Sequence, residues 1–183
     1  MAIVRFGHEP LSPAELSAAC LDGELVALGE GYAPSDALST PWVRAASLRP
    51  LLRDGLVGIG LTAAWVHGGV GEPPAVHRVQ RLAGRHLSRP VQSRVRYRDT
   101  PLAVSDAALL AGVRIATLVR TLVDLARESD EPASASAARR LASPVTLRDA
   151  HAWLDAHPRM PGSRAARCFL RELAEHAAGA RTT

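Results

Sequence analysis

The sequence contains no lysine, so all 22 of its basic residues are arginine. This absence excludes a lysine-containing phosphate-binding loop, a Schiff-base site and the lysine of a restriction-type nuclease core. Cysteine is scarce as well, because only Cys20 and Cys168 occur and they share no metal-binding or redox spacing. We therefore predict two small buried thiols in a reducing compartment, and no disulfide framework.

Long hydrophobic runs are also missing. No run reaches the length of a membrane span, and the amino-terminal segment MAIVRFGHEPLSP lacks the apolar stretch of a signal peptide. We expect no membrane association, and a cytoplasmic location is the default. One or more domains of ordinary globular type fit within 183 residues.

Residue patterns that support catalysis are missing in the same way. The seven histidines are scattered without zinc-ligand spacing, and the acids form no convergent pair in an apolar setting. His67 is expected to end a short helix, where the helix dipole favours a protonated imidazole. The sequence therefore predicts no catalytic residue, no metal site and no enzyme.

One glycine motif is similar to a dinucleotide-binding loop but lacks its context. Gly58, Gly60 and Ala63 fit the pattern G-x-G-x-x-A after an apolar run. A dinucleotide site also needs an acidic residue about twenty residues later, within a strand–helix–strand unit, and neither is present. We predict that these glycines allow a turn or close packing, and that no cofactor is bound.

The positive charge is concentrated in one stretch. Residues 73–98 hold seven arginines and no acid; four arginines and eight acids precede them, and eleven arginines and ten acids follow. The alternation in VQSRVRYR predicts a strand with Arg94, Arg96 and Arg98 in a row, about 6.6 Å apart. Such a row can follow phosphates. The predicted nucleic-acid-binding residues are Arg78, Arg81, Arg85, Arg89, Arg94, Arg96 and Arg98.

Two interpretations of this stretch are open. In one, the arginines bind an anionic partner, either a nucleic acid or an acidic protein surface. In the other, they fill the solvated face of an antiparallel sheet in an arginine-rich protein. We favour the first, because no neighbouring acid in the sequence compensates the charge and like charges side by side cost stability.

The order of elements predicts an α/β (α+β) fold. A capping box of Ser12 and Glu15 begins a helix, and two short strands around a glycine turn follow it. This is the last part of a winged-helix pattern, in a reduced form. A further helix is expected over about 40–54, with a kink or break at Pro50.

The second half of the chain is predicted to be mainly helical. Residues 103–116 are expected to form a short helix and a turn, before a strongly amphipathic helix. Within that helix Arg120 and Asp124 lie four apart, which predicts an intrahelical ion pair with a structural role. The small, polar segment 129–142 is predicted to be a linker, and 143–183 a two-helix tail.

Four motifs in order resemble one known family. They are TAAWVHGG (62–69), AVHRVQ (75–80), VRYR (95–98) and GVRIATLVRTLVDLARE (112–128). Together they resemble a large group of actinobacterial proteins related to the AbiEi antitoxins of abortive-infection toxin–antitoxin systems. The positions that match the family pattern G-x-x-V-T-T-x-x-R-T-L-x-D-L-A are Gly112, Thr117, Arg120, Thr121, Leu122, Asp124, Leu125 and Ala126.

The resemblance covers roughly residues 55–128 and implies a function. Family members typically bind operator DNA through an amino-terminal winged helix, and their partner is a nucleotidyltransferase-like toxin. The arginines of that wing are replaced here by Ala27, Gly29 and Glu30. The resemblance implies a non-enzymatic transcriptional regulator that binds duplex DNA at its own operator. The alternative is a protein-interaction module that has lost DNA binding and sequesters an acidic partner.

We therefore predict four parts of the chain. They are a reduced winged-helix-like segment (1–54), an AbiEi-like α/β core (55–128), the linker (129–142) and the two-helix tail (143–183).

Overall fold

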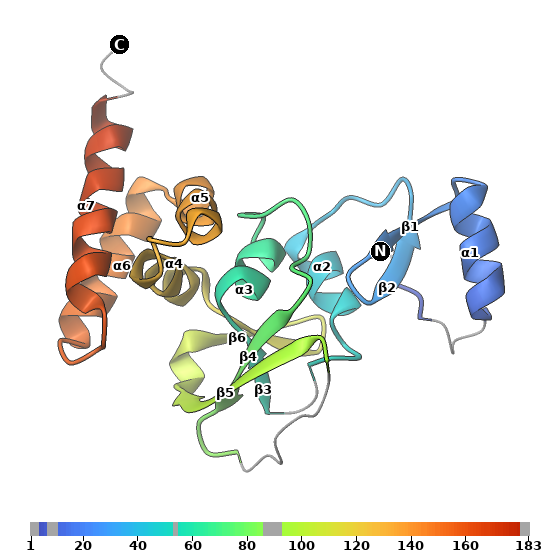
Figure 1. Cartoon of the computed structure of the whole chain (residues 1–183), viewed down its shortest axis with the longest axis horizontal. Helices are drawn as coiled ribbons and strands as arrows, with labels where there is room; N and C mark the ends of the chain where they lie inside the picture. Colours follow the sequence, from blue (N-terminus) through green and yellow to red (C-terminus); the bar gives the residue numbers. More distant parts are fainter. Residues whose placement is uncertain (1–3, 7–10, 53–54, 86–92, 180–183) are drawn as a thin grey trace.

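The chain has an α+β fold, as predicted (Figure 1). The computed structural model describes residues 4–6, 11–52, 55–85 and 93–179, with side chains to residue 176. A five-stranded mixed sheet has the strand order β5-β4-β3-β7-β6. The central strand β3 is antiparallel to β4 and parallel to β7. The strands are β3 (Leu56–Gly58), β4 (His77–Leu82), β5 (Val95–Leu102), β6 (Ala107–Leu110) and β7 (Val113–Ala116).

The larger of two hydrophobic clusters packs this sheet against α2 (Pro41–Ser47) and α3 (Gly60–Val66). Val57 and Trp65 are fully buried in it. Side chains of this size contribute about 1.5–3 kcal/mol each on full burial. The cluster therefore fixes the position of β3 and β4, and with them the arginines of the neighbouring edge strand.

The glycine motif has the packing role that was predicted for it. Gly58 lies on β3, where an added Cβ atom would come 3.1 Å from Cδ1 of Ile115. Gly60 begins α3 with a φ of 54°, in the left-handed region that favours glycine. The motif thus lets the chain turn from the sheet into a helix at close range.

The amino-terminal unit lies at one end of the molecule (Figure 1). It consists of α1 (Pro13–Leu21) and the hairpin of β1 (Leu25–Leu28) and β2 (Gly31–Pro34). The predicted capping box is present, because Ser12 and Glu15 each accept a hydrogen bond from the other's backbone N–H. The predicted order of helix, strand, turn and strand is therefore confirmed, while the winged-helix assignment stays a prediction.

Helix α2 is shorter than expected. It begins after Thr40, whose Oγ1 accepts the Val43 N–H, and it ends at Ser47 instead of continuing towards residue 54. The residue before a proline disfavours helical backbone, so the helix ends ahead of Pro50 instead of bending around it.

Four helices form the other end of the molecule (Figure 1). They enclose a second hydrophobic cluster, to which Leu122, Leu154 and Leu170 contribute fully buried side chains. The cluster joins residues far apart in the sequence into one packed unit. The helices are α4 (Leu118–Arg127), α5 (Pro132–Leu141), α6 (Pro144–Ala156) and α7 (Ser163–Gly179).

The predicted linker at 129–142 is wrong, because α5 occupies residues 132–141. Its small side chains are not solvated but buried, as Ala135, Ala137 and Ala138 show. Alanine and serine permit close helix packing as well as a flexible linker. Their composition alone did not distinguish the two.

The predicted short helix and turn over 103–116 is also wrong. Only Val104–Asp106 forms a turn of 3-10 helix, and the hairpin of β6 and β7 follows. The two turn residues, Ala111 and Gly112, have φ values of 50° and 85°. Positive φ at both positions matches the tight hairpin turn that suits twisted strands.

The two cysteines differ in their exposure to solvent. Cys20 is only half-buried and Cys168 is exposed, so the prediction of two buried thiols is wrong. Within the described ranges, none of the helices combines the length and apolarity needed to cross a bilayer.

Candidate nucleic-acid interface

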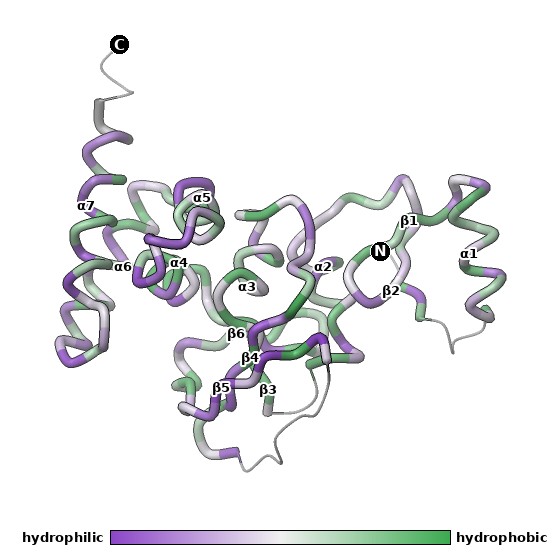
Figure 2. The backbone as a smooth tube through the Cα atoms, viewed as in Figure 1, coloured by the Kyte–Doolittle hydropathy of each residue, from purple (hydrophilic) through white to green (hydrophobic). Residues whose placement is uncertain are grey.

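Arg78 of β4 lies beside Arg96 of β5, on the sheet face that also carries Arg98. The two strands are parallel, and not antiparallel, with Arg78 paired to Arg96 and Gln80 paired to Arg98. Directly paired residues point to the same face of a sheet. Figure 2 shows hydrophilic residues gathered on these two strands. The fold therefore assembles a basic face from segments that are separate in the sequence.

Arg96 and Arg98 are the most open members of this face. Both are exposed, whereas Val95 and Tyr97, which alternate with them along the strand, are half-buried against the core. The predicted alternation along the strand is confirmed for these residues. The two arginines lie two positions apart, which places them about 6.6 Å from each other. No ion pair joins either one to another described residue.

Arg94 lies apart from this row. It occupies the turn before β5, and its NH1 atom lies 2.6 Å from Oε1 of Glu30. Glu30 belongs to the tip of the β1–β2 hairpin, more than sixty residues earlier in the sequence. The strand therefore carries two of the three arginines expected in the row, and the third contacts a carboxylate.

Arg78 and Arg81 also have acidic partners. Arg78 forms ion pairs with Glu128 and Glu131. Nε of Arg81 lies 3.3 Å from Oδ1 of Asp99. Hydrogen bonds from the Tyr97 hydroxyl and from Arg81 hold the pKa of Asp99 below its ordinary value.

The expectation that the charge of this stretch is uncompensated is therefore wrong. Apart from Asp99, the compensating acids come from distant parts of the sequence and meet the arginines only after folding. The surface open to an anionic partner is smaller than the seven arginines suggest.

Two further predicted residues lie beyond the strands. Arg85 is exposed in the turn after β4, and its backbone carbonyl accepts a hydrogen bond from Arg81. Arg89 lies outside the described residues. Arg85 therefore remains a candidate contact beside the strand row.

Sequence analysis did not predict Arg114. It lies on β7, and the sheet register places it in one cross-strand row with Val57, Gln80 and Arg98. It is half-buried and shares the sheet face of Arg98, three strands away. At about 4.8 Å per strand, their backbones are about 14 Å apart. Only the strand register shows that Arg114 and Arg98 share one cross-strand row.

No protein-family model and no curated protein matches this chain. The resemblance to AbiEi-like antitoxins therefore stays a prediction, and the functional argument depends on the geometry. Among the described residues, no three side chains of the metal-ligating kinds come together.

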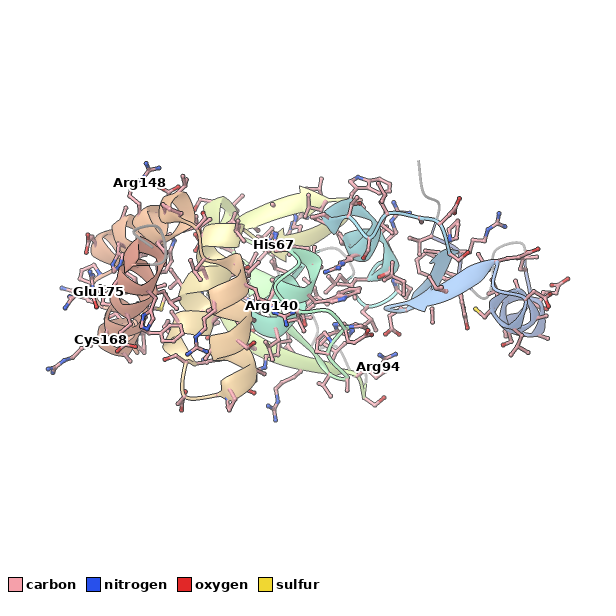
Figure 3. All side chains as sticks on the ribbon, turned by 90° about the horizontal axis from the view of Figure 1, so that it is seen from above. His67, Arg94, Arg140, Arg148, Cys168 and Glu175 are labelled. Atoms are coloured by element: carbon pink, nitrogen blue, oxygen red, sulfur yellow. The ribbon has the colours of Figure 1, made fainter. Side chains whose placement is uncertain are left out.

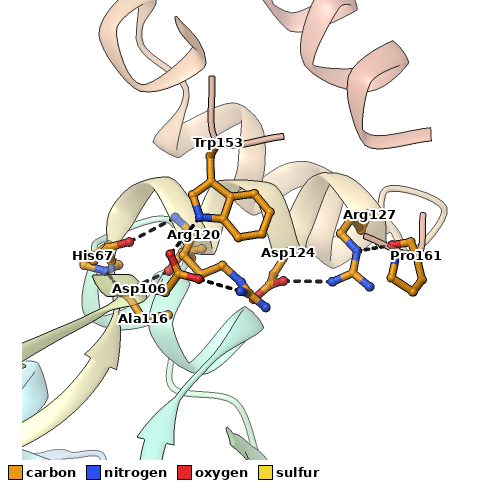
Figure 4. Close-up of polar contacts among 10 residues, drawn as sticks. His67, Asp106, Ala116, Arg120, Asp124, Arg127, Trp153 and Pro161 are labelled. Atoms are coloured by element: carbon orange, nitrogen blue, oxygen red, sulfur yellow. Dashed lines mark hydrogen bonds and ion pairs between the residues drawn. The ribbon is translucent and has the colours of Figure 1, made fainter. Parts of the chain in front are cut away.

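Arg120 and Asp124 form the predicted intrahelical ion pair, with Nε 3.0 Å from Oδ2 (Figure 4). Arg120 also donates to Oδ2 of Asp106 at 2.8 Å, and Nε1 of Trp153 donates to the other oxygen of that carboxylate. Burial alone would lower the pKa of Arg120, but Asp124 and Asp106 together raise it. All three charged groups are buried, so the network stabilises the fold and offers no open site.

His67 is also structural. It ends α3 as expected, and its Nε2 lies 2.8 Å from the carbonyl oxygen of Ala116 (Figure 4). Burial lowers its pKa, and the bond to Ala116 only partly opposes this. The lowered pKa favours the neutral ring, which donates from Nε2 to Ala116, over the protonated imidazole that was expected at the helix end.

Proposed function

We propose that this protein is a non-enzymatic, cytoplasmic transcriptional regulator of the AbiEi antitoxin type that contacts duplex DNA at its own operator. The observation that carries the proposal is the exposed pair Arg96 and Arg98 on an edge strand of the sheet. Guanidinium groups at this spacing suit successive backbone phosphates, which position a protein on DNA without reading its sequence.

Arg85 extends this surface, because it is exposed and follows β4 beside the strand pair. Arg114 shares a cross-strand row with Arg98, but the buried Val57 and Gln80 separate the two arginines. A charged edge strand also prevents edge-to-edge aggregation, which is a structural reason for arginines on β5. That reason applies to β5 alone and does not account for the exposed Arg85, which follows β4.

DNA binding with matched double variants tests this proposal. A labelled duplex from the region upstream of the gene is titrated with protein at low salt. Arg96→Gln/Arg98→Gln should weaken binding roughly tenfold or more, and should reduce the slope of log affinity against log salt by about 1.8.

The control is Arg148→Gln/Arg159→Gln, which removes the same charge from exposed residues of the helical region. Figure 3 shows Arg148 at the helical end of the molecule, far from Arg94 beside the sheet. The control should bind as the wild type does. No binding by the wild type at low salt, or an equal loss in the control, would overturn the proposal.

A second candidate is the protein-interaction module that sequesters an acidic partner, such as a nucleotidyltransferase-like toxin. The observation that favours it is the opposite sheet edge. Strand β6 carries no charge, and Leu109 on it and Val104 before it are 62% and 59% exposed. An uncharged edge strand with exposed apolar side chains is suited to pairing with another chain.

Co-expression with the product of the neighbouring reading frame separates the two candidates. A stable complex that contains no nucleic acid, and that Leu109→Lys disrupts, would support the interaction module. If Leu109→Lys leaves the complex intact, or if no complex forms, the β6 edge is not the surface that binds the partner.

A further inference from the structure

The tip of the β1–β2 hairpin packs closely against residues of α2 and α3. Gly29 at this tip has a φ of 57°. A Cβ atom added there would clash with Oγ of Ser47 and would lie 3.2 Å from Cη2 of Trp65. Only glycine fits this position without displacement, and the close fit directs the next residue, Glu30, towards the sheet.

Glu30 is held between two basic side chains. Its Oε1 atom lies 2.6 Å from NH1 of Arg94 and 3.9 Å from Nε2 of His77. The side chain of Glu30 is 15% exposed, whereas that of Arg94 is 46% exposed. In Figure 3 Arg94 lies at the surface on the side of the sheet nearest the hairpin. A partly buried carboxylate of the hairpin therefore contacts a guanidinium that is open to solvent.

This contact leaves polar atoms unsatisfied. Oε1 of Glu30 and Nε2 of His77 are buried, and neither has a hydrogen-bond partner among the described residues. The short distance to Arg94 is thus a charge contact without hydrogen-bond geometry. Each buried polar atom left without a partner costs about 1–3 kcal/mol. The docked hairpin tip is consequently opposed by this cost, although the ion pair attracts it.

His77 does not neutralise Glu30. Burial, and secondly the charge of Arg94, lower the pKa of His77 to about 4, so its ring is uncharged at neutral pH. The charge attraction on the Glu30 carboxylate comes from Arg94. Removing that attraction leaves a buried carboxylate beside a neutral ring, which favours release of the tip into water.

We propose that Glu30 is an autoinhibitory latch on the nucleic-acid-binding surface: it occupies Arg94 while the hairpin tip is docked, and frees Arg94 for a DNA phosphate when the tip is released. This inference rests on the proposed DNA binding. Arg94 lies in the turn directly before β5, so the freed guanidinium would add one phosphate contact next to those of Arg96 and Arg98. A phosphate and Glu30 compete for the same cation, so DNA binding and hairpin docking oppose each other reciprocally.

A double-mutant cycle tests the latch, with a labelled random-sequence duplex titrated over a series of salt concentrations. Glu30→Gln should raise affinity severalfold and steepen the salt slope by about 0.9, which is one phosphate contact. Arg94→Gln alone should change affinity little. In the Glu30→Gln background Arg94→Gln should abolish the gain, since both changes act on one interaction.

The matched control is Glu24→Gln, which removes one negative charge from an exposed residue of the same region. Glu24→Gln should change DNA affinity only slightly, and this change measures the long-range effect of removing one negative charge. Gly29→Ala is a second route to the same state, because the added Cβ displaces the tip while Glu30 stays intact. Gly29→Ala should also raise the affinity for DNA. Its circular dichroism spectrum should match that of the wild type, which shows that the sheet is intact.

The outcomes separate the two proposals. If the wild type binds DNA but Glu30→Gln matches it or matches Glu24→Gln, the latch alone is overturned. The same holds if the gain persists in the double variant. If neither the wild type nor Glu30→Gln nor Gly29→Ala binds DNA, the latch and the proposed function are both overturned.

Discussion

Arg120 illustrates how a buried charge is retained in this protein. Its side chain is nearly inaccessible, yet carboxylates of Asp106 and Asp124 contact it and the ring of Trp153 lies 5.0 Å from its guanidinium carbon. Arg127 donates to the remaining oxygen of Asp124 at 3.1 Å. Such a complete network offsets the cost of desolvation, whereas a partial network does not.

Arg120→Met should therefore lower the free energy of unfolding by about 3–5 kcal/mol, because it leaves two buried carboxylates without their shared cation. Chemical denaturation measures the change. Arg148→Met, which removes an arginine that is 72% exposed and paired to Asp149, should cost less than about 1 kcal/mol. Equal losses in the two variants would show that burial of the network contributes nothing.

The same residue shows what could be predicted from sequence. Asp124 lies one helical turn from Arg120, so periodicity alone predicted their ion pair. Asp106 and Trp153 join the network from other elements, through contacts that only the tertiary fold creates. Glu30 meets Arg94 in the same way. Local partners were predictable, and non-local partners were not.

At the scale of elements, α5 shows why composition misled. Serine and alanine in a short stretch fit a linker, but they also fit a helix that packs closely against its neighbours. Gly69, which follows α3, lies directly against α5: a Cβ atom there would lie 2.7 Å from Cγ of Leu141. A glycine in one segment thus makes room for a leucine of α5, and neither segment reveals the other in the sequence.

Aspartate substitutions on α5 distinguish a packed helix from a linker. Ala138→Asp buries an unpaired carboxylate at a fully buried position and should lower the free energy of unfolding by several kcal/mol. Ala133→Asp lies exposed in the first turn, where the helix dipole favours an acid, and should be neutral or slightly stabilising. Thermal unfolding of both variants provides the comparison. Tolerance of both changes would mean that 132–141 is not packed.

On the scale of the whole molecule, the two hydrophobic clusters meet within α3. Trp65 packs into the cluster of the sheet, and Ala64, one residue earlier, packs into the cluster of the four helices. Successive residues of one short helix thus face different cores. The Arg120 network adds a second connection, since Asp106 precedes β6 while Trp153 lies on α6. We therefore expect the described parts to unfold together, so that a buried group in either core affects the stability of the whole.

Acid should consequently weaken the whole fold before most carboxylates titrate. The folded pKa of His77 is about 4, against an ordinary value of 6.5. Between these values the unfolded chain binds more protons than the folded chain, so the free energy of unfolding falls as pH falls. His77 alone should cost about 2 kcal/mol between neutral pH and about pH 5, and His67, whose pKa is also lowered by burial, acts in the same direction. Denaturation curves over this range measure the slope, and His77→Gln should make it shallower. An unchanged slope in that variant would show that His77 is not held neutral in the folded state, because the proton it lacks is the source of the effect.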